Sequence, residues 1–134
     1  MTDSNHDLVR TFFRALGAGT LSDDLFTSDM TVWTVSSGSA DMGRFLGGAR
    51  LLASIFNGTL VYTINSLTAE DDRVAVEAQS HGTLINGEPY HNTHMYLLRI
   101  RDGRIAAISE FMNQTLIKDK VVPLMQQVMT KRQS

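Results

Sequence analysis

The sequence predicts one α+β domain in which a curved antiparallel sheet folds over helices. Two observations predict this. Hydrophobic residues follow a helical period of about 3.6 in the first half and alternate with a strand period from Leu60 onward. The second half also contains Asn86-Gly87 and Asp102-Gly103, dipeptides typical of tight β-hairpins. With 134 residues, 43% of them hydrophobic and 19% charged, the chain has the composition of a single globular domain.

The first half predicts two helices and one strand. Residues 4–17 place their large apolar side chains on one helical face, and Gly17 and Gly19 end this helix. Residues 31–35 are β-branched or aromatic and predict a strand, whereas the small polar residues 36–43 predict a loop. Residues 46–56 predict a second helix, which Asn57-Gly58 terminates.

The second half predicts strands over residues 61–68, 73–85, 90–101 and 104–113. If both hairpin dipeptides form two-residue loops, the residues that share one sheet face include Ala75, Glu77, Gln79, His81, Asn92, His94, Tyr96, Leu98, Ser109, Phe111 and Asn113. The opposite face then includes Val74, Val76, Ala78, Ser80, Thr93, Met95, Leu97, Ala106, Ile108, Glu110 and Met112. We expect the first face to line a small-molecule pocket and the second to form a core or a subunit interface. A bulge in the middle strand would exchange part of this assignment.

Composition excludes several classes of function. A formal net charge of −2 offers no basic surplus for nucleic acid, and the absence of cysteine removes disulfides and thiolate sites. Because we find no signal peptide and no run of about 18 apolar residues, we expect a soluble cytoplasmic protein without a membrane partner. His81 and His94 share a face but lack a third ligand, so we expect no metal and no cofactor.

Several motifs resemble the nuclear-transport-factor-2-like superfamily, specifically its SnoaL-like (polyketide cyclase-like) branch. They include Phe12-Phe13-x-Ala-Leu in the first helix, the segment 25–33 ending at Trp33, Gly82-Thr-Leu-Ile-Asn-Gly-Glu-Pro-Tyr90 and Glu110-Phe-Met-Asn113. The resemblance covers nearly the whole chain. It implies a single domain over residues 1–134, folded as a cone-shaped, cystatin-like α+β roll. It also implies a pocket on the concave face of the sheet and a homodimer formed through the sheet.

The resemblance also identifies where enzymes of the superfamily keep their catalytic groups. The positions that match a ketosteroid isomerase hold Phe12, Thr34 and Tyr96, so the base is missing. Those that match a limonene-epoxide hydrolase hold Glu77, Gln79 and Asn113. The general-base Asp expected of SnoaL-like cyclases also matches Asn113, and an amide cannot take a proton at neutral pH. The known catalytic carboxylates are therefore absent from the positions that the resemblance indicates.

The remaining candidate for chemistry is His94, whose imidazole titrates near neutrality, with Glu77 to orient it and Tyr96 to donate to a carbonyl oxygen. Glu110, on the other face, is expected to be structural or interfacial. The expected ligand-binding residues are Trp33, Phe12, Gln79, His81, Asn92, Leu98, Ser109, Phe111 and Asn113.

Three hypotheses about function remain open. The first is an enzyme that isomerises, cyclises or dehydrates a small, largely apolar carbonyl compound by proton transfer. The second is a non-catalytic binding module that uses the same pocket, and the third is a dimeric interaction module. The Met-rich C-terminal tail, which Pro123 should kink, could cap the pocket or reach a neighbouring subunit.

Overall fold

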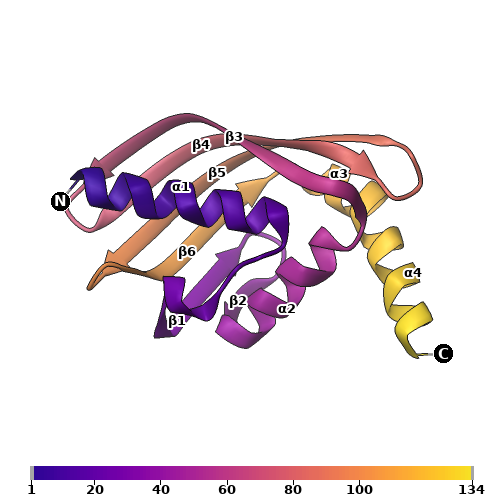
Figure 1. Cartoon of the computed structure of the whole chain (residues 1–134), viewed down its shortest axis with the longest axis horizontal. Coiled ribbons are helices and arrows are strands. Elements are labelled where there is room, and N and C mark those ends of the chain that lie inside the picture. The colour runs from indigo at the N-terminus through magenta and orange to yellow at the C-terminus, as the bar shows by residue number, and fades with distance from the viewer. Residues whose placement is uncertain (1, 134) are drawn as a thin grey trace.

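The computed structural model describes residues 2–133 and shows a six-stranded mixed sheet that arches over α1 and α2 (Figure 1). Its elements are α1 (Thr2–Ala18), a 3₁₀ turn (Asp23–Leu25), β1 (Phe26–Thr34), β2 (Gly38–Asp41), α2 (Met42–Ala53), β3 (Phe56–Glu70), β4 (Arg73–Leu84), β5 (Pro89–Arg101), β6 (Arg104–Met112), α3 (Gln114–Leu116), a π-helical turn (Ile117–Val121) and α4 (Val122–Gln133). The strand order is β2-β1-β6-β5-β4-β3, with β1 parallel to β6 and every other pair antiparallel. The predicted α+β class is confirmed. No helix within the described residues is long and apolar enough to cross a membrane.

One predicted element is wrong. The segment 36–43 was expected to be a loop, but residues 38–41 form β2 and pair antiparallel with β1. This strand lies at the edge of the sheet and carries small or polar residues, so hydrophobic alternation cannot mark it. Asp41 ends the strand and also caps α2, because its carboxylate accepts a hydrogen bond from the Arg44 backbone N–H at 3.0 Å.

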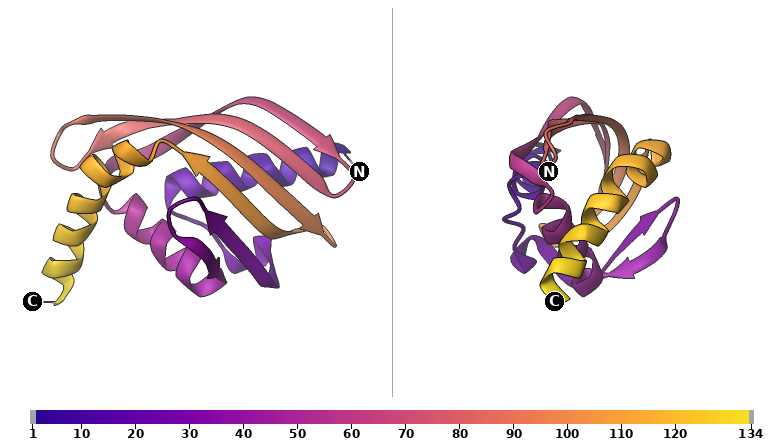
Figure 2. Two further views of the ribbon diagram at one scale, coloured as in Figure 1. Left: turned by 180° about the vertical axis from the view of Figure 1, so that it is seen from behind. Right: turned by 90° about the vertical axis from the view of Figure 1, so that its right-hand side faces the viewer.

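Two hydrophobic clusters fill the concave side of the sheet. The larger lies under α1 and includes Phe12, Phe13, Val76 and Leu98. The smaller lies nearer α4 and is made of Ile55, Phe56, Leu60, Leu84, Tyr90, Val121 and Leu124. Seen from behind, the sheet arches over α1 and α2, while α4 extends away from the body at the end opposite the N-terminus (Figure 2).

Pro123 interrupts the C-terminal helix, as predicted, through a specific change in hydrogen bonding. The backbone N–H of Val122 donates to the carbonyl of Ile117, five residues earlier, which makes the preceding turn π-helical. Proline has no N–H to donate and its ring crowds the preceding turn of a regular helix. The wider turn therefore lets the chain continue as α4, and Val121 at the end of the turn and Leu124 in α4 anchor this segment on the smaller cluster.

The two predicted hairpin loops have different lengths. Arg101 pairs with Arg104, and both Asp102 and Gly103 have positive φ, so this loop has the two residues expected. In the other hairpin the Leu84 N–H donates to the Glu88 carbonyl at 2.9 Å, which leaves a three-residue loop. There Gly87 alone has positive φ, as in a turn followed by a G1 bulge.

The predicted register between β4 and β5 is therefore wrong by one residue, and the inward face of β4 is reversed. Glu77 lies opposite Met95 instead of Tyr96, and Ala78 lies opposite His94. Because side chains alternate across a strand, a shift of one residue exchanges the two faces. The predicted inward face of β5, which carries Asn92, His94, Tyr96 and Leu98, is the buried one.

A β-bulge in β6 exchanges the inward and outward side chains of its second half, relative to the prediction. Ile100 pairs with Ile105 as predicted, but Arg99 pairs with Ala107, so Ala106 has no partner. Beyond this bulge Glu110, not Ser109 or Phe111, points to the concave side and lies opposite Tyr96. The prediction that Glu110 belongs to the outer face is wrong for this reason.

Gly17 fixes how closely α1 approaches β3. A methyl group at this position would overlap the carbonyl oxygen of Leu60, whereas one at Gly48, on the exposed side of α2, would meet no atom within 4 Å. We expect Gly17→Ala to lower the free energy of unfolding by about 1–3 kcal/mol, because the backbones must separate. Gly48→Ala should raise it by about 0.5–1 kcal/mol through helix propensity. Urea unfolding of both variants tests this close approach, and equal effects would contradict it.

Candidate functional site

A layer of polar side chains crosses the inside of the cone between the two hydrophobic clusters. We call it the polar belt; its members are Tyr62, Ser80, Tyr90, Asn92, His94, Tyr96 and Glu110. Along β5 the inward residues pass from Leu98 through the belt to Tyr90, so apolar packing flanks the belt at both ends. Ser80 is 0% exposed and His94 is 4% exposed. These groups are withdrawn from water and must find partners within the protein.

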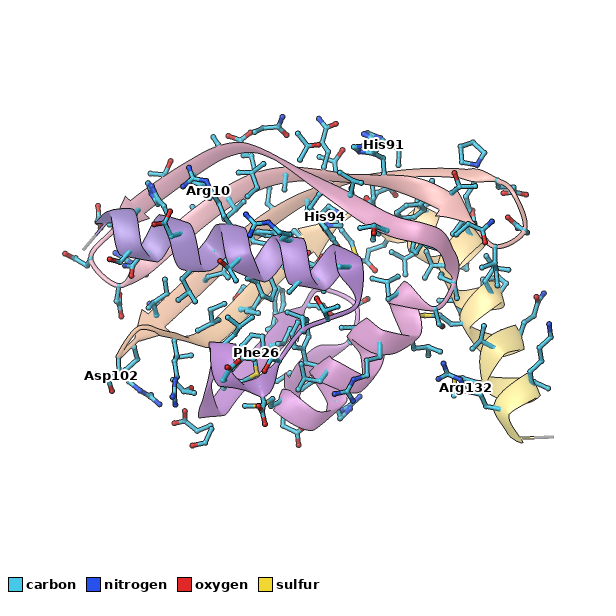
Figure 3. The ribbon with its side chains drawn as sticks, viewed as in Figure 1. Arg10, Phe26, His91, His94, Asp102 and Arg132 are labelled. Atoms are coloured by element: carbon cyan, nitrogen blue, oxygen red, sulfur yellow. The ribbon has the colours of Figure 1, made fainter. Side chains whose placement is uncertain are left out.

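His94 lies at the centre of the belt. Figure 3 shows it beneath the sheet, whereas His91, three residues earlier, lies on the outer surface. One ring nitrogen, Nδ1, is 3.0 Å from Glu110 Oε2, and the other, Nε2, is 2.8 Å from Ser80 Oγ. Because a carboxylate only accepts hydrogen bonds, a neutral His94 carries its proton on Nδ1 and accepts from the Ser80 hydroxyl through Nε2.

Glu110 receives a second donor at the same oxygen. The Tyr96 hydroxyl donates to Oε2 at 2.6 Å, a short charge-assisted hydrogen bond. The Glu110 side chain is 14% exposed, and Oε1 has no protein hydrogen-bond partner among the described residues. The protein therefore holds one oxygen of Glu110 and leaves the other without a hydrogen bond among the described residues.

Burial keeps the tyrosine hydroxyls of the belt protonated. It is the main cause that raises the pKa of Tyr96 well above its ordinary value, and the negative charge of Glu110 adds to it. Burial and then the same charge also raise the pKa of Tyr62. The pKa of Tyr90 is raised by burial as well, although hydrogen bonds with Asn92 and Ser80 act against the shift. All three tyrosines of the chain belong to the belt.

Asn92 connects the belt to the end of β6. Its Nδ2 donates to the Tyr90 hydroxyl at 2.9 Å, and its Oδ1 accepts from the Asn113 backbone N–H at 3.0 Å. The Asn113 side chain does not enter the belt. It caps α3 by accepting from the Thr115 and Leu116 N–H groups, so it lies at the exposed start of a helix.

Five of the residues predicted for the site lie on the concave side. His94, Tyr96 and Asn92 belong to the belt, and Leu98 is fully buried in the larger cluster. Phe12 is also buried there, with its ring packed edge-on against Phe13.

The other predicted site residues lie outside the belt. Glu77 is exposed and accepts a hydrogen bond from Ser66 Oγ at 2.9 Å, so it cannot orient His94. Gln79 Oε1 is 2.9 Å from His91 Nε2, and His81 is exposed. Trp33 and Phe111 pack against each other on the outer face, with ring centroids 5.3 Å apart, and Ser109 lies beside Trp33 on the neighbouring strand.

Sequence reasoning missed four members of the belt: Tyr62, Ser80, Tyr90 and Glu110. A signal for Ser80 was present, because the alternative face of β4 carries Val74, Val76 and Ala78, which bury more favourably than Glu77 and Gln79. No comparable signal marked Glu110, since the bulge at Ala106 involves only small residues. Within residues 2–133, no three His, Asp or Glu side chains are placed to bind a metal ion together.

Comparisons with known proteins agree with this architecture. The family model described as SnoaL-like domain matches residues 9–108. IdmH, a candidate polyketide cyclase from Streptomyces antibioticus, superposes with a TM-score of 0.72 at 20% identity and covers 82% of this chain and 92% of its own. A candidate SnoaL-like polyketide cyclase from Jannaschia sp. CCS1 gives 0.74 at 15% identity, over 87% and 90%.

A third structure shares the fold and carries a small molecule. It is a protein from Catenulispora acidiphila with a ketosteroid isomerase-like fold, solved in complex with trimethylamine. It gives a TM-score of 0.66 at 20% identity, over 78% of this chain and 83% of its own. No curated protein matches the sequence. At these identities the structural likeness establishes the NTF2-like fold alone.

The raised tyrosine pKa values predict a loss of stability at high pH. Above about pH 10 the unfolded chain releases phenolic protons that the folded chain retains, so the folded state binds more protons and its stability falls as pH rises. The expected slope is up to about 1.4 kcal/mol per pH unit for each tyrosine. Phenolate absorbance should therefore be absent at pH 10.5 in the native protein and present in urea. Reversible native titration near pH 10 would contradict the burial of the belt.

Proposed function

Because the chain belongs to the SnoaL-like family, we propose that it catalyses proton transfer on a small, largely apolar carbonyl compound, as an isomerisation, cyclisation or dehydration. The observation that supports this proposal is the Glu110 carboxylate, which has one oxygen bound by His94 and Tyr96 and the other without a partner among residues 2–133. The similar folds of two candidate polyketide cyclases are consistent with it.

The geometry favours Glu110 over His94 as the group that meets the substrate. Both ring nitrogens of His94 already have protein partners, and the ring is almost fully buried. Glu110 Oε1 can accept a proton from the carbon beside a carbonyl group, which leaves an enolate and a neutral carboxylic acid. The acid then returns the proton to another atom of the same molecule. His94 and Tyr96 hold the carboxylate in place and stay hydrogen-bonded through the cycle.

A second candidate, a non-catalytic binding module, is favoured by a different observation. The belt residues satisfy one another, and Ser80, Asn92 and His94 are nearly inaccessible. Such a network can simply specify a polar cavity wall without reacting. The two candidates differ in whether a bound ketone exchanges protons or only stabilises the fold.

Deuterium exchange separates the candidates. We expect the protein to accelerate exchange of the α-hydrogens of 2-tetralone in D₂O, measured by NMR, and Glu110→Gln to lower the rate at least about 100-fold. Glu77→Gln is the matched control, because this exposed carboxylate faces away from the belt, and it should retain the wild-type rate. His94→Gln should lower the rate less than Glu110→Gln. If neither protein nor variants change the exchange rate while 2-tetralone raises Tm, the binding module is correct.

We also propose that the protein forms a homodimer through the outer face of the sheet. Trp33, Met95 and Phe111, from β1, β5 and β6, expose apolar side chains there, and Phe111 is 51% exposed. Met95 and Phe111 are directly paired, and Trp33 contacts Phe111, so the three residues form one continuous apolar surface. Exposed patches of this kind mark interaction sites, and a twofold axis lets one patch cover its own copy.

Sedimentation tests the dimer. We expect the wild-type protein to sediment as a dimer at micromolar concentration and Met95→Glu/Phe111→Glu to sediment as a monomer, because two buried charges per subunit would lack partners. Ile85→Glu, an exposed apolar residue in the β4–β5 loop, should leave the dimer intact. A monomeric wild-type protein would exclude the interface.

A further inference from the structure

A groove runs between α1 and the edge strand β3, on the outer side of Tyr62. Its volume is about 280 Å³, close to the lower end for small-ligand sites. Its walls include Arg10, Phe13 and Arg14 from α1 and Leu60, Tyr62 and Ile64 from β3. Figure 3 shows the Arg10 side chain in the space between α1 and β3.

The groove combines positive charge with an apolar floor. Arg14 has no ion-pair partner among the described residues, and Arg10 makes only a long, exposed contact of 3.6 Å with Asp7. Such an exposed pair contributes little and leaves the guanidinium group of Arg10 available. The two arginines lie four residues apart on α1, so their side chains project from the same side of the helix. Apart from Thr59, the other walls are aromatic or aliphatic.

β3 is an edge strand, so part of its backbone faces the groove without a neighbouring strand. β3 pairs with β4 on one side and with no strand on the other, so alternate backbone N–H groups along its outer edge have no sheet partner. Close packing at Gly17 against Leu60 holds the C-terminal part of α1 against this strand. The groove is thus bounded by a fixed contact at one end and by the arginines toward the other.

Tyr62 is the wall that the groove shares with the polar belt. Its ring lines the groove, while its centroid lies 5.5 Å from that of His94 and 5.4 Å from that of Phe13. A molecule in the groove would therefore be separated from His94 by a single side chain. This location connects the surface groove to the interior of the cone.

We propose that this groove binds an amphipathic anion, a molecule with an apolar body and one carboxylate or phosphate group. Arg10 and Arg14 bind the anionic group through their guanidinium donors, and Phe13, Leu60 and Ile64 pack against the body. The proposal goes beyond the proposed function by adding a second binding site, which the Tyr62 side chain separates from His94. It concerns binding alone, so it stands or falls independently of turnover.

Calorimetric titration with decanoate and decyl phosphate, each below its micelle concentration, and with decanol below its solubility limit tests the proposal. We expect at least one of the two anions to bind saturably and decanol to bind at least about tenfold more weakly. The tighter anion identifies whether the site prefers a carboxylate or a phosphate. Binding should weaken as salt is raised, because the arginines are exposed.

Matched variants locate the site. Arg10→Gln/Arg14→Gln should weaken binding of the preferred anion about tenfold and leave decanol unchanged, whereas Arg44→Gln, an exposed arginine on α2, should change neither. Amide resonances of residues 59–64 should shift on binding. Equal affinities for anion and alcohol, or equal anion affinities in the wild type and the double variant, would overturn the proposal. If the wild-type protein binds the anion but does not accelerate deuterium exchange of 2-tetralone, only the proposed proton transfer is contradicted.

Discussion

The arrangement of the interior depends on the need to keep a largely buried carboxylate paired. A carboxylate withdrawn from water is unfavourable unless donors replace the lost hydration. Here the Tyr96 hydroxyl and the His94 ring supply two hydrogen bonds to one oxygen of Glu110. Ser80 then occupies the remaining nitrogen of His94. These residues come from β4, β5 and β6, so the pairing of a single side chain requires the mutual register of three strands.

The hydrophobic clusters on both sides give this network its properties. They exclude water, which lowers the local dielectric constant and strengthens each hydrogen bond in the belt. The same exclusion raises the pKa values of the tyrosines and keeps their hydroxyls as donors. Because packing in the clusters fixes the strands, the unpaired oxygen of Glu110 is held in a defined position. Preorganisation of this kind is what proton transfer needs.

Most of the fold could be predicted from the sequence because its signals are local. The change of hydrophobic period separates the helices from the sheet, and the inward residues of β5 follow from simple alternation. Pairing between strands is less local, since it depends on loop length and bulges. Asn86-Gly87 is compatible with a two-residue or a three-residue loop, and only Gly87 has positive φ in the structure.

The candidate site was harder to predict for the same reason. His94 and Tyr96 lie on the predicted inward face because both belong to β5, whose own alternation is uninterrupted. Glu77 was predicted as their carboxylate partner because the predicted registers of β5 with β4 and of β5 with the second half of β6 are each wrong by one residue. The family resemblance indicated Asn113 as the position of the general base in related enzymes, but its side chain caps a helix. A histidine and a tyrosine were thus found without the acid that binds them both.

The bulge at Ala106 implies a route by which the interior of such a cone could change during evolution. Absorption of Ala106 into the ladder between β5 and β6 would restore regular alternation and place Ser109 opposite Tyr96, which would turn Phe111 inward and Glu110 outward. An acidic inward position would become aromatic without any amino acid being replaced. Among relatives of low identity, the presence or absence of a bulge in β6, or a one-residue change in the β4–β5 loop, can therefore alter chemistry as much as a substitution does. Alignments that ignore such differences would compare inward residues of one protein with outward residues of another.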